Sequence, residues 1–425
     1  MDLEADIPES WKTRCVRDIG EVVTGRTPST KREDFYGGDY NLISPADLDN
    51  GKYVFTAHKR LSRTGFGECR ALPKDTVLVG CIGNVGKLGM VTNDRSATNQ
   101  QINAVICNPD NDPHFIYYCL YASRGRLERA ADKTTVPILN KTNFENFQVA
   151  VPPLPEQRKI SAVLGLVQRA MEQQERLLAL TAELKKALLH QLFTHGLRGE
   201  PQKQTEIGSV PESWDIVPLG SLAKIGNGST PKRGNAGYWQ GGTIPWLNSA
   251  KIHERFITVA DQFVTHLAVK ECHLPRVKPG SLLIAITGQG KTLGNSALVS
   301  FETCINQHLA YAQFTSPRVM PEFVLWFMQT RYEHLRSISQ AGGSTKGALT
   351  CGYLKTYPIL APSLDEQHEI TGVFAALNRK EKVHAGKHAA LTSLFRTLLH
   401  QLMTAQIRVH DLSLPKSETN RNEKS

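Results

Sequence analysis

The chain has 425 residues, of which 40% are hydrophobic and 21% charged, so it can bury ordinary cores and is too long for one compact domain. Its formal net charge of +10 favours a polyanionic partner. Eight scattered cysteines without a CxxC pair give no indication of a disulfide framework or a zinc finger. Because no apolar run reaches the ~18 residues of a membrane span and the first residues lack a signal-peptide pattern, we expect a cytoplasmic protein.

An internal repeat of about 205 to 210 residues runs through the sequence. Its landmarks keep their order in both copies, while the residues between them differ greatly. The landmarks are residues 7–11 (IPESW) and 210–214 (VPESW), 25–28 (GRTP) and 228–231 (GSTP), 99–100 and 306–307 (both NQ), 151–157 (VPPLPEQ) and 361–367 (APSLDEQ), and 188–192 and 398–402 (both LLHQL). We therefore predict two halves that share one framework and differ in the side chains that they present.

Each half begins with a stretch that is rich in Gly, Pro and Asn. Short β-type runs alternate there with brief helical patterns, which is typical of a compact α+β domain. The predicted domains are residues 1–153 and 209–362, with strands at 76–79 and 281–286 and helices at 114–121 and 322–328.

After a cluster of prolines, each half continues into one long predicted helix, residues 154–196 and residues 363–405. Apolar residues recur in both at heptad-like spacing, so each helix should carry one apolar stripe. Because a stripe needs a partner, we favour an antiparallel coiled-coil pair related by a pseudo-twofold axis. Two separate amphipathic helices lying on their own domains remain the alternative. Residues 197–208 are predicted as a linker and residues 406–425 as a disordered tail.

One loop has the appearance of a catalytic motif. Residues 285–292 (AITGQGKT) follow a predicted strand and match a relaxed phosphate-binding loop. The other half has Leu88 where Thr292 stands, and the residues after Lys291 predict a turn and a strand where the motif requires a helix. Neither HExxH nor GxSxG occurs, so we predict no active site and no metal site.

Cationic and amide side chains lie beside glycines in the predicted loops of both domains. Such loops suit backbone approach to phosphates and contacts to base edges, and two similar basic domains held apart by long helices suit two-point contact with double-stranded DNA. A solvated surface charge remains the alternative for any one of them. The candidate DNA-binding residues are Arg26, Lys31, Arg32, Lys59, Arg60, Arg63, Lys87, Lys133, Lys232, Arg233, Lys251, Gln289, Lys291 and Lys346.

With these landmarks the chain resembles the specificity subunit of Type I restriction-modification systems over residues 1–405. The resemblance rests on the PESW starts, the Gly-x-Thr-Pro turns, the PLPEQ and SLDEQ helix entries and the two LLHQL segments. It implies that each domain is a target recognition domain reading one half of a split DNA site. It also implies a non-catalytic chain without a bound cofactor, with S-adenosylmethionine, ATP and Mg on the modification (methyltransferase) and restriction (motor nuclease) subunits.

The resemblance further implies that the helices bind the modification subunits. We expect apolar stripe residues left over after helix pairing to form that subunit interface. The candidates are Ile160, Leu164, Leu188, Leu192, Ile370, Leu377, Leu398 and Leu402. Two other functions stay open, a coiled-coil scaffold that joins other proteins and a nucleotide-binding enzyme that uses the loop around Lys291.

Overall fold

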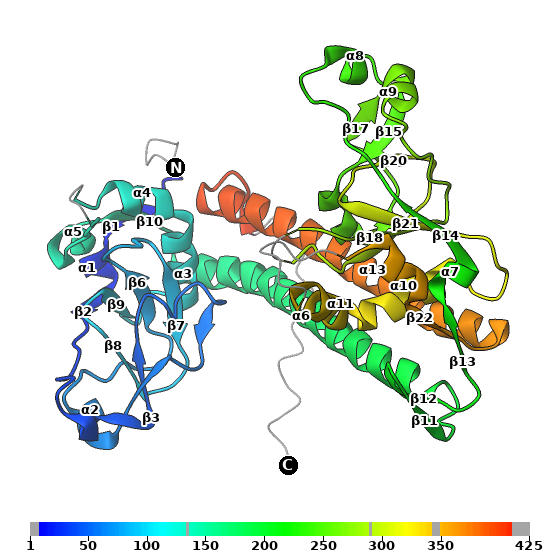
Figure 1. Ribbon diagram of the computed structural model, residues 1–425. Coiled ribbons are helices and arrows are strands. Elements are labelled where there is room, and N and C mark those ends of the chain that lie inside the picture. The colour runs from blue at the N-terminus through cyan, green and yellow to red at the C-terminus, as the bar shows by residue number, and fades with distance from the viewer. Residues whose placement is uncertain (1–7, 133–135, 289–290, 342–348, 410–425) are drawn as a thin grey trace. The chain divides into compact units, whose positions relative to one another are not determined.

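The computed structural model describes residues 8–132, 136–288, 291–341 and 349–409. The chain divides into two compact units, one formed by residues 1–177 with 384–425 and the other by residues 178–383. Each unit combines one domain with part of each long helix and has its own buried cores (Figure 1). In the described ranges no helix is both long and apolar enough to span a membrane.

A five-stranded sheet forms the centre of the first unit's domain. Its central strand is buried on both faces because side chains alternate between two cores. Val77 and Val79 pack in the core that contains α3, and Leu78 packs with Ile43 in the other. The strand order is β2 (Gly20–Thr24), β9 (Ile102–Cys107), β6 (Val77–Gly80), β7 (Leu88–Val91) and β4 (Tyr53–Val54), with only β4 and β7 parallel.

Smaller sheets and short helices complete this domain. A three-stranded sheet has the order β5 (Lys59–Leu61), β3 (Tyr36–Ile43) and β8 (Ser96–Thr98), and β1 (Lys12–Cys15) pairs with β10 (Gln148–Val151). The helices are α1 (Val16–Ile19), η1 (Glu33–Phe35), α2 (Arg63–Gly67), α3 (Pro113–Ala122), α4 (Arg124–Arg129) and α5 (Lys141–Glu145). Asp112 begins α3 because its carboxylate accepts the amide hydrogens of His114 and Phe115, and Pro113 follows as first residue.

The second unit's domain repeats this design. Leu282 and Ile284 of its central strand enter one core, and Leu283 enters another. The central sheet has the order β14 (Ala223–Asn227), β21 (Leu309–Phe314), β18 (Leu282–Ala285), β19 (Ser296–Val299) and β16 (Phe256–Ile257). The smaller sheets are β17 (Gln262–Val264), β15 (Ile244–Leu247) and β20 (Cys304–Ile305); β13 (Asp215–Pro218) and β22 (Pro358–Ala361); and β11 (Gln202–Thr205) and β12 (Gly208–Pro211). The helices are α7 (Leu219–Leu222), α8 (Ala236–Trp239), η2 (Ser249–Glu254), α9 (His266–Glu271), α10 (Pro321–Thr330), α11 (Tyr332–Ala341) and α12 (Cys351–Thr356).

Two long helices, α6 (Leu154–His195) and α13 (Leu364–Met403), contribute to both units. In the first unit the early part of α6 lies beside the late part of α13, where His384 Nδ1 is 2.8 Å from Gln174 Oε1. In the second unit the late part of α6 lies beside the early part of α13, where Lys185 Nζ is 3.2 Å from Glu381 Oε2. The pairing is therefore antiparallel, and the predicted α+β fold with two similar domains and paired long helices is confirmed.

Two segments differ from the sequence-based expectation. The predicted linker, residues 197–208, contains strand β11 and the first residue of its partner β12, so it is a β-hairpin and not a plain connection. Residues 406–409, which were assigned to the tail, are packed against the first domain. Val409 is buried there, and Arg408 donates to Glu156 at 2.9 and 3.0 Å. Low sequence hydrophobicity concealed these contacts because few side chains, chiefly Ile407, Arg408 and Val409, anchor the segment.

Candidate nucleic-acid interface

In each domain, the Gly-x-Thr-Pro turn is bonded to the Asn-Gln pair. We call these repeated contacts the frame. Thr27 Oγ1 donates to Gln100 Oε1 at 2.6 Å, and Thr230 makes the same bond to Gln307. A Cβ atom on Gly25 would lie 2.2 Å from the Thr98 carbonyl oxygen, so only glycine fits this close approach. The repeated landmarks therefore hold strand ends together and fix where the variable loops begin.

In the first domain, the loop at residues 44–50 contacts the candidate residue Lys87 and its neighbour Leu88. Lys87 Nζ donates to the Pro45 carbonyl oxygen at 3.4 Å, and the Leu88 amide donates to Asp49 Oδ1 at 3.1 Å. A hollow of about 450 Å³, lined in part by Lys87 and Arg124, opens beside this loop. We call residues 44–50, 55–60 and 83–87 the first rim, and residues 248–254, 258–263 and 291–292 of the second domain the second rim.

The candidate cations of the first domain fall into two groups. Arg32 makes a two-point contact with Asp34 at 2.8 and 2.7 Å, and Arg60 lies 3.9 Å from Asp39. These two guanidinium groups are partly neutralised by their own domain. The exposed cations with no ion pair among the described residues are Arg26, Lys31, Lys59 and Arg63.

The second domain shows the same division. Lys251 Nζ is 2.6 Å from Glu254 Oε1, and its pKa is raised by its hydrogen bonds to Glu254 and Asp261. The Arg233 guanidinium lies over the indoles of Trp239 and Trp246, at 4.0 and 4.9 Å. Both groups are therefore held in place. Lys232 and Lys291 are exposed, and no ion pair involves them within the ranges that the structure covers.

Three candidates cannot be placed. Lys133, Gln289 and Lys346 lie outside the described residues. They remain predictions from the sequence.

The helix residues proposed as a subunit interface face inward. Six of the eight are buried in the cores of their own units, namely Ile160, Leu164, Leu192, Ile370, Leu377 and Leu402. Leu188 and Leu398 are half-buried against the same cores. This expectation is therefore corrected for these eight positions, which pack within their own units. Other apolar side chains of the long helices remain exposed, among them Leu184 at 49% and Leu394 at 45%.

Lys291 does not stand in a phosphate-binding loop. The residues that follow it turn at Gly294 and enter β19, so no helix N-terminus is available to face a phosphate. The structure also holds no group of three or more His, Cys, Asp or Glu side chains suited to a metal ion among its described residues.

Two buried glutamines were recognised in the sequence only as landmarks. Gln157 Oε1 accepts the Asp112 amide hydrogen at 2.8 Å, and its Nε2 donates to the Pro152 carbonyl at 2.9 Å. Gln367 makes the matching bonds to Met320 and Pro362 at the same distances. Each glutamine thus joins the start of a long helix to the start of a domain helix, and its place in the repeat was the evidence that could have revealed this role.

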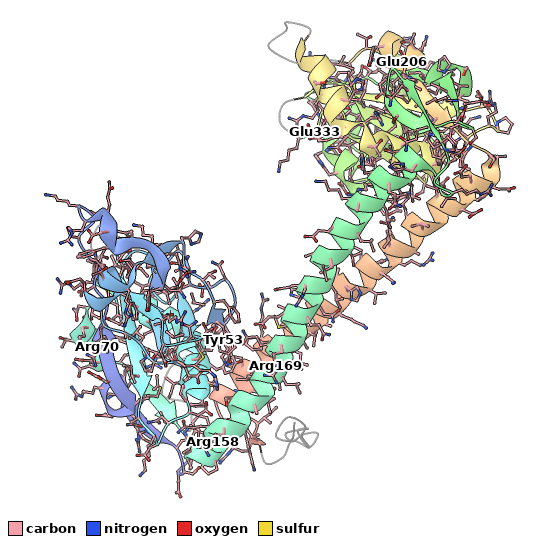
Figure 2. All side chains as sticks on the ribbon, turned by 90° about the horizontal axis from the view of Figure 1, so that it is seen from below. Tyr53, Arg70, Arg158, Arg169, Glu206 and Glu333 are labelled. Carbon is pink, nitrogen blue, oxygen red and sulfur yellow. The ribbon has the colours of Figure 1, made fainter. Side chains whose placement is uncertain are left out.

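A buried lysine was also missed. Lys52 is 6% exposed, and its ammonium lies 4.3 Å from the ring centre of Tyr118 and 5.5 Å from that of Tyr53. Burial lowers its pKa to about 8. Figure 2 shows Tyr53 on the side of the domain that faces α6, which carries Arg169. Lys52 therefore belongs to the junction between domain and helix.

Comparison with known proteins identifies the family of this fold. The model of the Type I restriction modification DNA specificity domain matches residues 8–182 and 211–393. The MjaIX specificity subunit of a Type I restriction enzyme from Methanocaldococcus jannaschii is 22% identical over 420 residues, which are 96% of this chain and 95% of that protein. The HindI specificity subunit of Haemophilus influenzae is 28% identical over 151 residues, or 34% of this chain and 33% of the relative.

Solved structures share the fold. The crystal structure of the S subunit of a Type I restriction-modification system from M. genitalium has a TM-score of 0.61 at 16% identity and covers 95% of this chain and 98% of its own. A structure from a study of type I R-M complex assembly has a TM-score of 0.55 at 18% identity, covering 95% and 100%. Neither the scaffold nor the nucleotide-using enzyme gains support from these matches. The chain belongs to the family of the Type I restriction modification DNA specificity domain, as a non-catalytic subunit that recognises DNA sequence.

Proposed function

We propose that each domain reads one half of a split DNA site and that the chain directs modification and restriction subunits to that site. The observation that carries this proposal is that the repeated internal contacts are the same in both halves while the exposed loop side chains differ. The Thr–Gln bonds and the buried helix-entry glutamines are the same in both halves, whereas the exposed side chains differ. A shared frame with unlike surfaces suits two readers of unlike sequences.

The chemistry then belongs to partner chains. On this proposal S-adenosylmethionine, ATP and Mg are bound by the modification and restriction subunits, and this chain contributes only recognition and assembly. The relatives reported above are specificity subunits of Type I restriction enzymes, which supports this division. We also infer that the complex acts in the cytoplasm, where it would meet cellular DNA.

Domain replacement tests the proposal directly. Residues 1–153 would be exchanged for the corresponding domain of a relative, and the complex with its modification subunits would be used to map methylated bases. We expect one half of the recognised site to change and the other half to stay the same. A change in both halves, in a complex that still assembles, would contradict independent reading.

The exposed lysines of the rims should contact phosphates. Lys59→Ala and Lys291→Ala should each reduce the slope of log affinity against log salt by about one, with little change in the preferred sequence. Lys12→Ala is a suitable control, because Lys12 is exposed beside Gln157 at the helix junction. A slope unchanged in both rim variants would remove these lysines from the DNA surface.

A further inference from the structure

The strand register of the two domains reveals a matched pair of positions. The backbone N–H of Asn99 donates to the Ile43 carbonyl at 3.0 Å, and the backbone N–H of Asn306 donates to the Leu247 carbonyl at 2.9 Å. Ile43 and Leu247 are therefore equivalent in the repeat. Counting four residues forward from each, Asp47 of the first domain is equivalent to Lys251 of the second.

The opposing strands give the second half of the match. Leu42 pairs with Lys59 in the first domain, and Trp246 pairs with Gln262 in the second. One residue before these partners stand His58 and Asp261. The equivalent pairs are thus Asp47 with His58, and Lys251 with Asp261.

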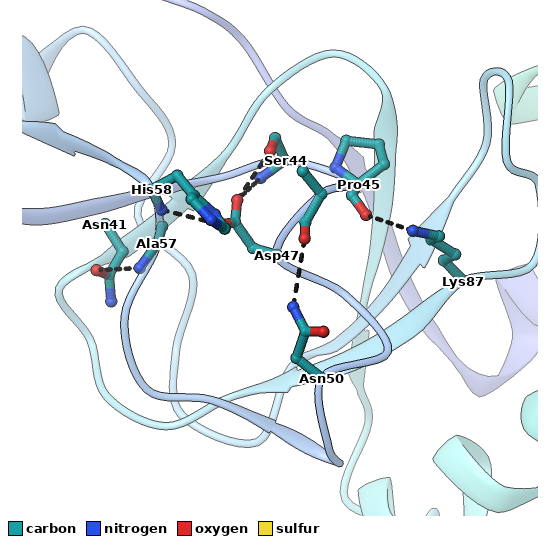
Figure 3. A network of polar contacts seen from close by, with 9 residues as sticks. Asn41, Ser44, Pro45, Asp47, Asn50, Ala57, His58 and Lys87 are labelled. Atoms are coloured by element: carbon teal, nitrogen blue, oxygen red, sulfur yellow. Dashed lines mark hydrogen bonds and ion pairs between the residues drawn. The ribbon is translucent and has the colours of Figure 1, made fainter. Parts of the chain in front are cut away.

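In the first domain, the buried member of the pair is acidic (Figure 3). The side chain of Asp47 is 2% exposed, and its Oδ1 lies 2.5 Å from His58 Nδ1 and accepts the His58 amide at 2.8 Å. Burial alone would raise the pKa of Asp47, but hydrogen bonds from His58 and Ser44 lower it. An ionised carboxylate can only accept, so His58 donates from Nδ1, and its Nε2 makes no hydrogen bond within the described residues.

In the second domain, the less exposed member is basic. The side chain of Lys251 is 12% exposed, and its Nζ lies 3.0 Å from Asp261 Oδ2. Glu254 is a second partner of the same ammonium. The acidic member is therefore the less exposed one in the first domain and the more exposed one in the second, and the paired side chains lie within 3.0 Å of each other in both.

His58 and Asp261, the exposed members, share one feature. Each has an exposed side chain whose position is restricted by a less exposed partner. The side chain of His58 is 76% exposed and that of Asp261 67% exposed. Their partners, Asp47 and Lys251, stand on segments that lie near candidate cations. Pro45, close to Asp47, accepts from Lys87, and His253, close to Lys251, lies 3.3 Å from Thr292 beside Lys291.

A carboxylate on such a surface has a restricted set of DNA contacts. Beside phosphates it is repelled, whereas it accepts readily from an exocyclic amino group such as cytosine N4 in the major groove. An imidazole held through Nδ1 differs from a carboxylate in both charge and hydrogen-bonding capacity. On a surface that faces DNA, the two pairs would therefore favour different bases at equivalent positions.

We propose that His58 and Asp261 are matched base-reading residues, with Asp261 accepting from the exocyclic amino group of a base, and that Asp47 and Lys251 are their positioning residues. This inference rests on the proposed function, because it requires that the rims face DNA. It adds the particular position at which the two half-sites are distinguished.

The test compares two carboxylates bound to the same ammonium. Asp261→Ala and Glu254→Ala remove the same charge from Lys251, and both side chains are substantially exposed, at 67% and 42%. Methylation rates would be measured with the full complex on DNA sites that vary one base pair at a time. We expect Asp261→Ala to relax discrimination roughly ten- to a hundredfold at a single base pair of one half-site. Glu254→Ala should leave every preference unchanged.

The remaining variants extend the comparison. His58→Ala should relax a single position in the other half-site, and Lys251→Met should relax the same base pair as Asp261→Ala. Unchanged preferences in Asp261→Ala and His58→Ala, or an equal effect of Glu254→Ala at the same base pair, would overturn the inference. If domain replacement still moves one half-site, the proposed function survives that result. If replacement moves neither half, the proposed function itself fails.

Discussion

The junctions between helix and domain in the two units use unlike side chains at equivalent positions. In the first unit Phe395 packs edge-on against Tyr118 and Tyr121, with ring centres 6.1 and 6.2 Å apart. The equivalent residue of the second unit is Lys185, since an LLHQL segment begins three residues after each. Lys185 lies 5.1 Å from the ring centre of Trp326.

The difference shows that the repeat fixes where a side chain stands and leaves its chemistry free. An aromatic ring on the domain can receive either another ring or a cation. Burial lowers the pKa of Lys185, and its contact with Glu381 opposes this by favouring the charged form. The buried glutamines at the starts of the long helices are identical in both units. The side chain therefore varies where the later part of a long helix packs on the domain, and it is constant where a long helix begins.

Replacing the ring of the first unit by the cation found in the second should have the largest effect on stability. Phe395→Lys would place an ammonium between Tyr118 and Tyr121 and remove a ring that is only 8% exposed. We expect a loss of at least about 3 kcal/mol in the free energy of unfolding, from lost packing and an incompletely solvated charge. Urea denaturation would measure it. A loss below about 1 kcal/mol would show that this crossing tolerates both side chains.

The identical glutamines should be about equally costly to remove. Gln157→Leu and Gln367→Leu leave a buried amide hydrogen and at least one carbonyl without a partner in each unit. We expect each to lose roughly 2 to 4 kcal/mol of unfolding free energy in denaturant titrations. Gln173→Leu, on the exposed surface of α6, should change it by less than about 0.5 kcal/mol. Unequal losses would show that the two helix entries are not energetically equivalent.

Lys52 distinguishes the first unit by its response to pH. The pKa of Lys52 is about 8 in the folded chain and 10.5 without burial. Between these values the unfolded chain binds more protons, so the folded state gains stability as pH rises. Lys52→Met should therefore be more stable than the wild type by roughly 3 kcal/mol below pH 8. The difference should shrink towards zero near pH 10.5. Denaturation of both proteins across this range would show it, and a constant difference would contradict the assignment.

Removing the buried cation of the second unit should have the smallest effect. Lys185→Met keeps most of the side chain's contact with Trp326, and Glu381, 43% exposed, can be solvated when its partner is lost. Because an apolar replacement of a buried ion pair is often neutral, we expect a change within about 1 kcal/mol. A loss of several kcal/mol would make the cation as necessary to its unit as Phe395 is to the other.

The sequence by itself determined the repeat, the α+β domains and the long helices. The expected strands at 76–79 and 281–286 correspond to β6 and β18, and the expected helix at 114–121 corresponds to α3. These elements were predictable because local periodicity depends on which faces of a strand or helix are apolar. The same logic identified the stripe on α6.

Only the tertiary structure decided what covers each face and which charges are paired. Periodicity identified Ile160 and Leu402 as apolar stripe positions but could not show that they lie within the chain's own cores. Composition likewise could not separate Arg32, which binds Asp34, from Lys59, which is exposed. The physical reason is that burial and ion pairing arise between segments distant in sequence, brought together by strand register and loop path, and neither leaves a local pattern in the chain.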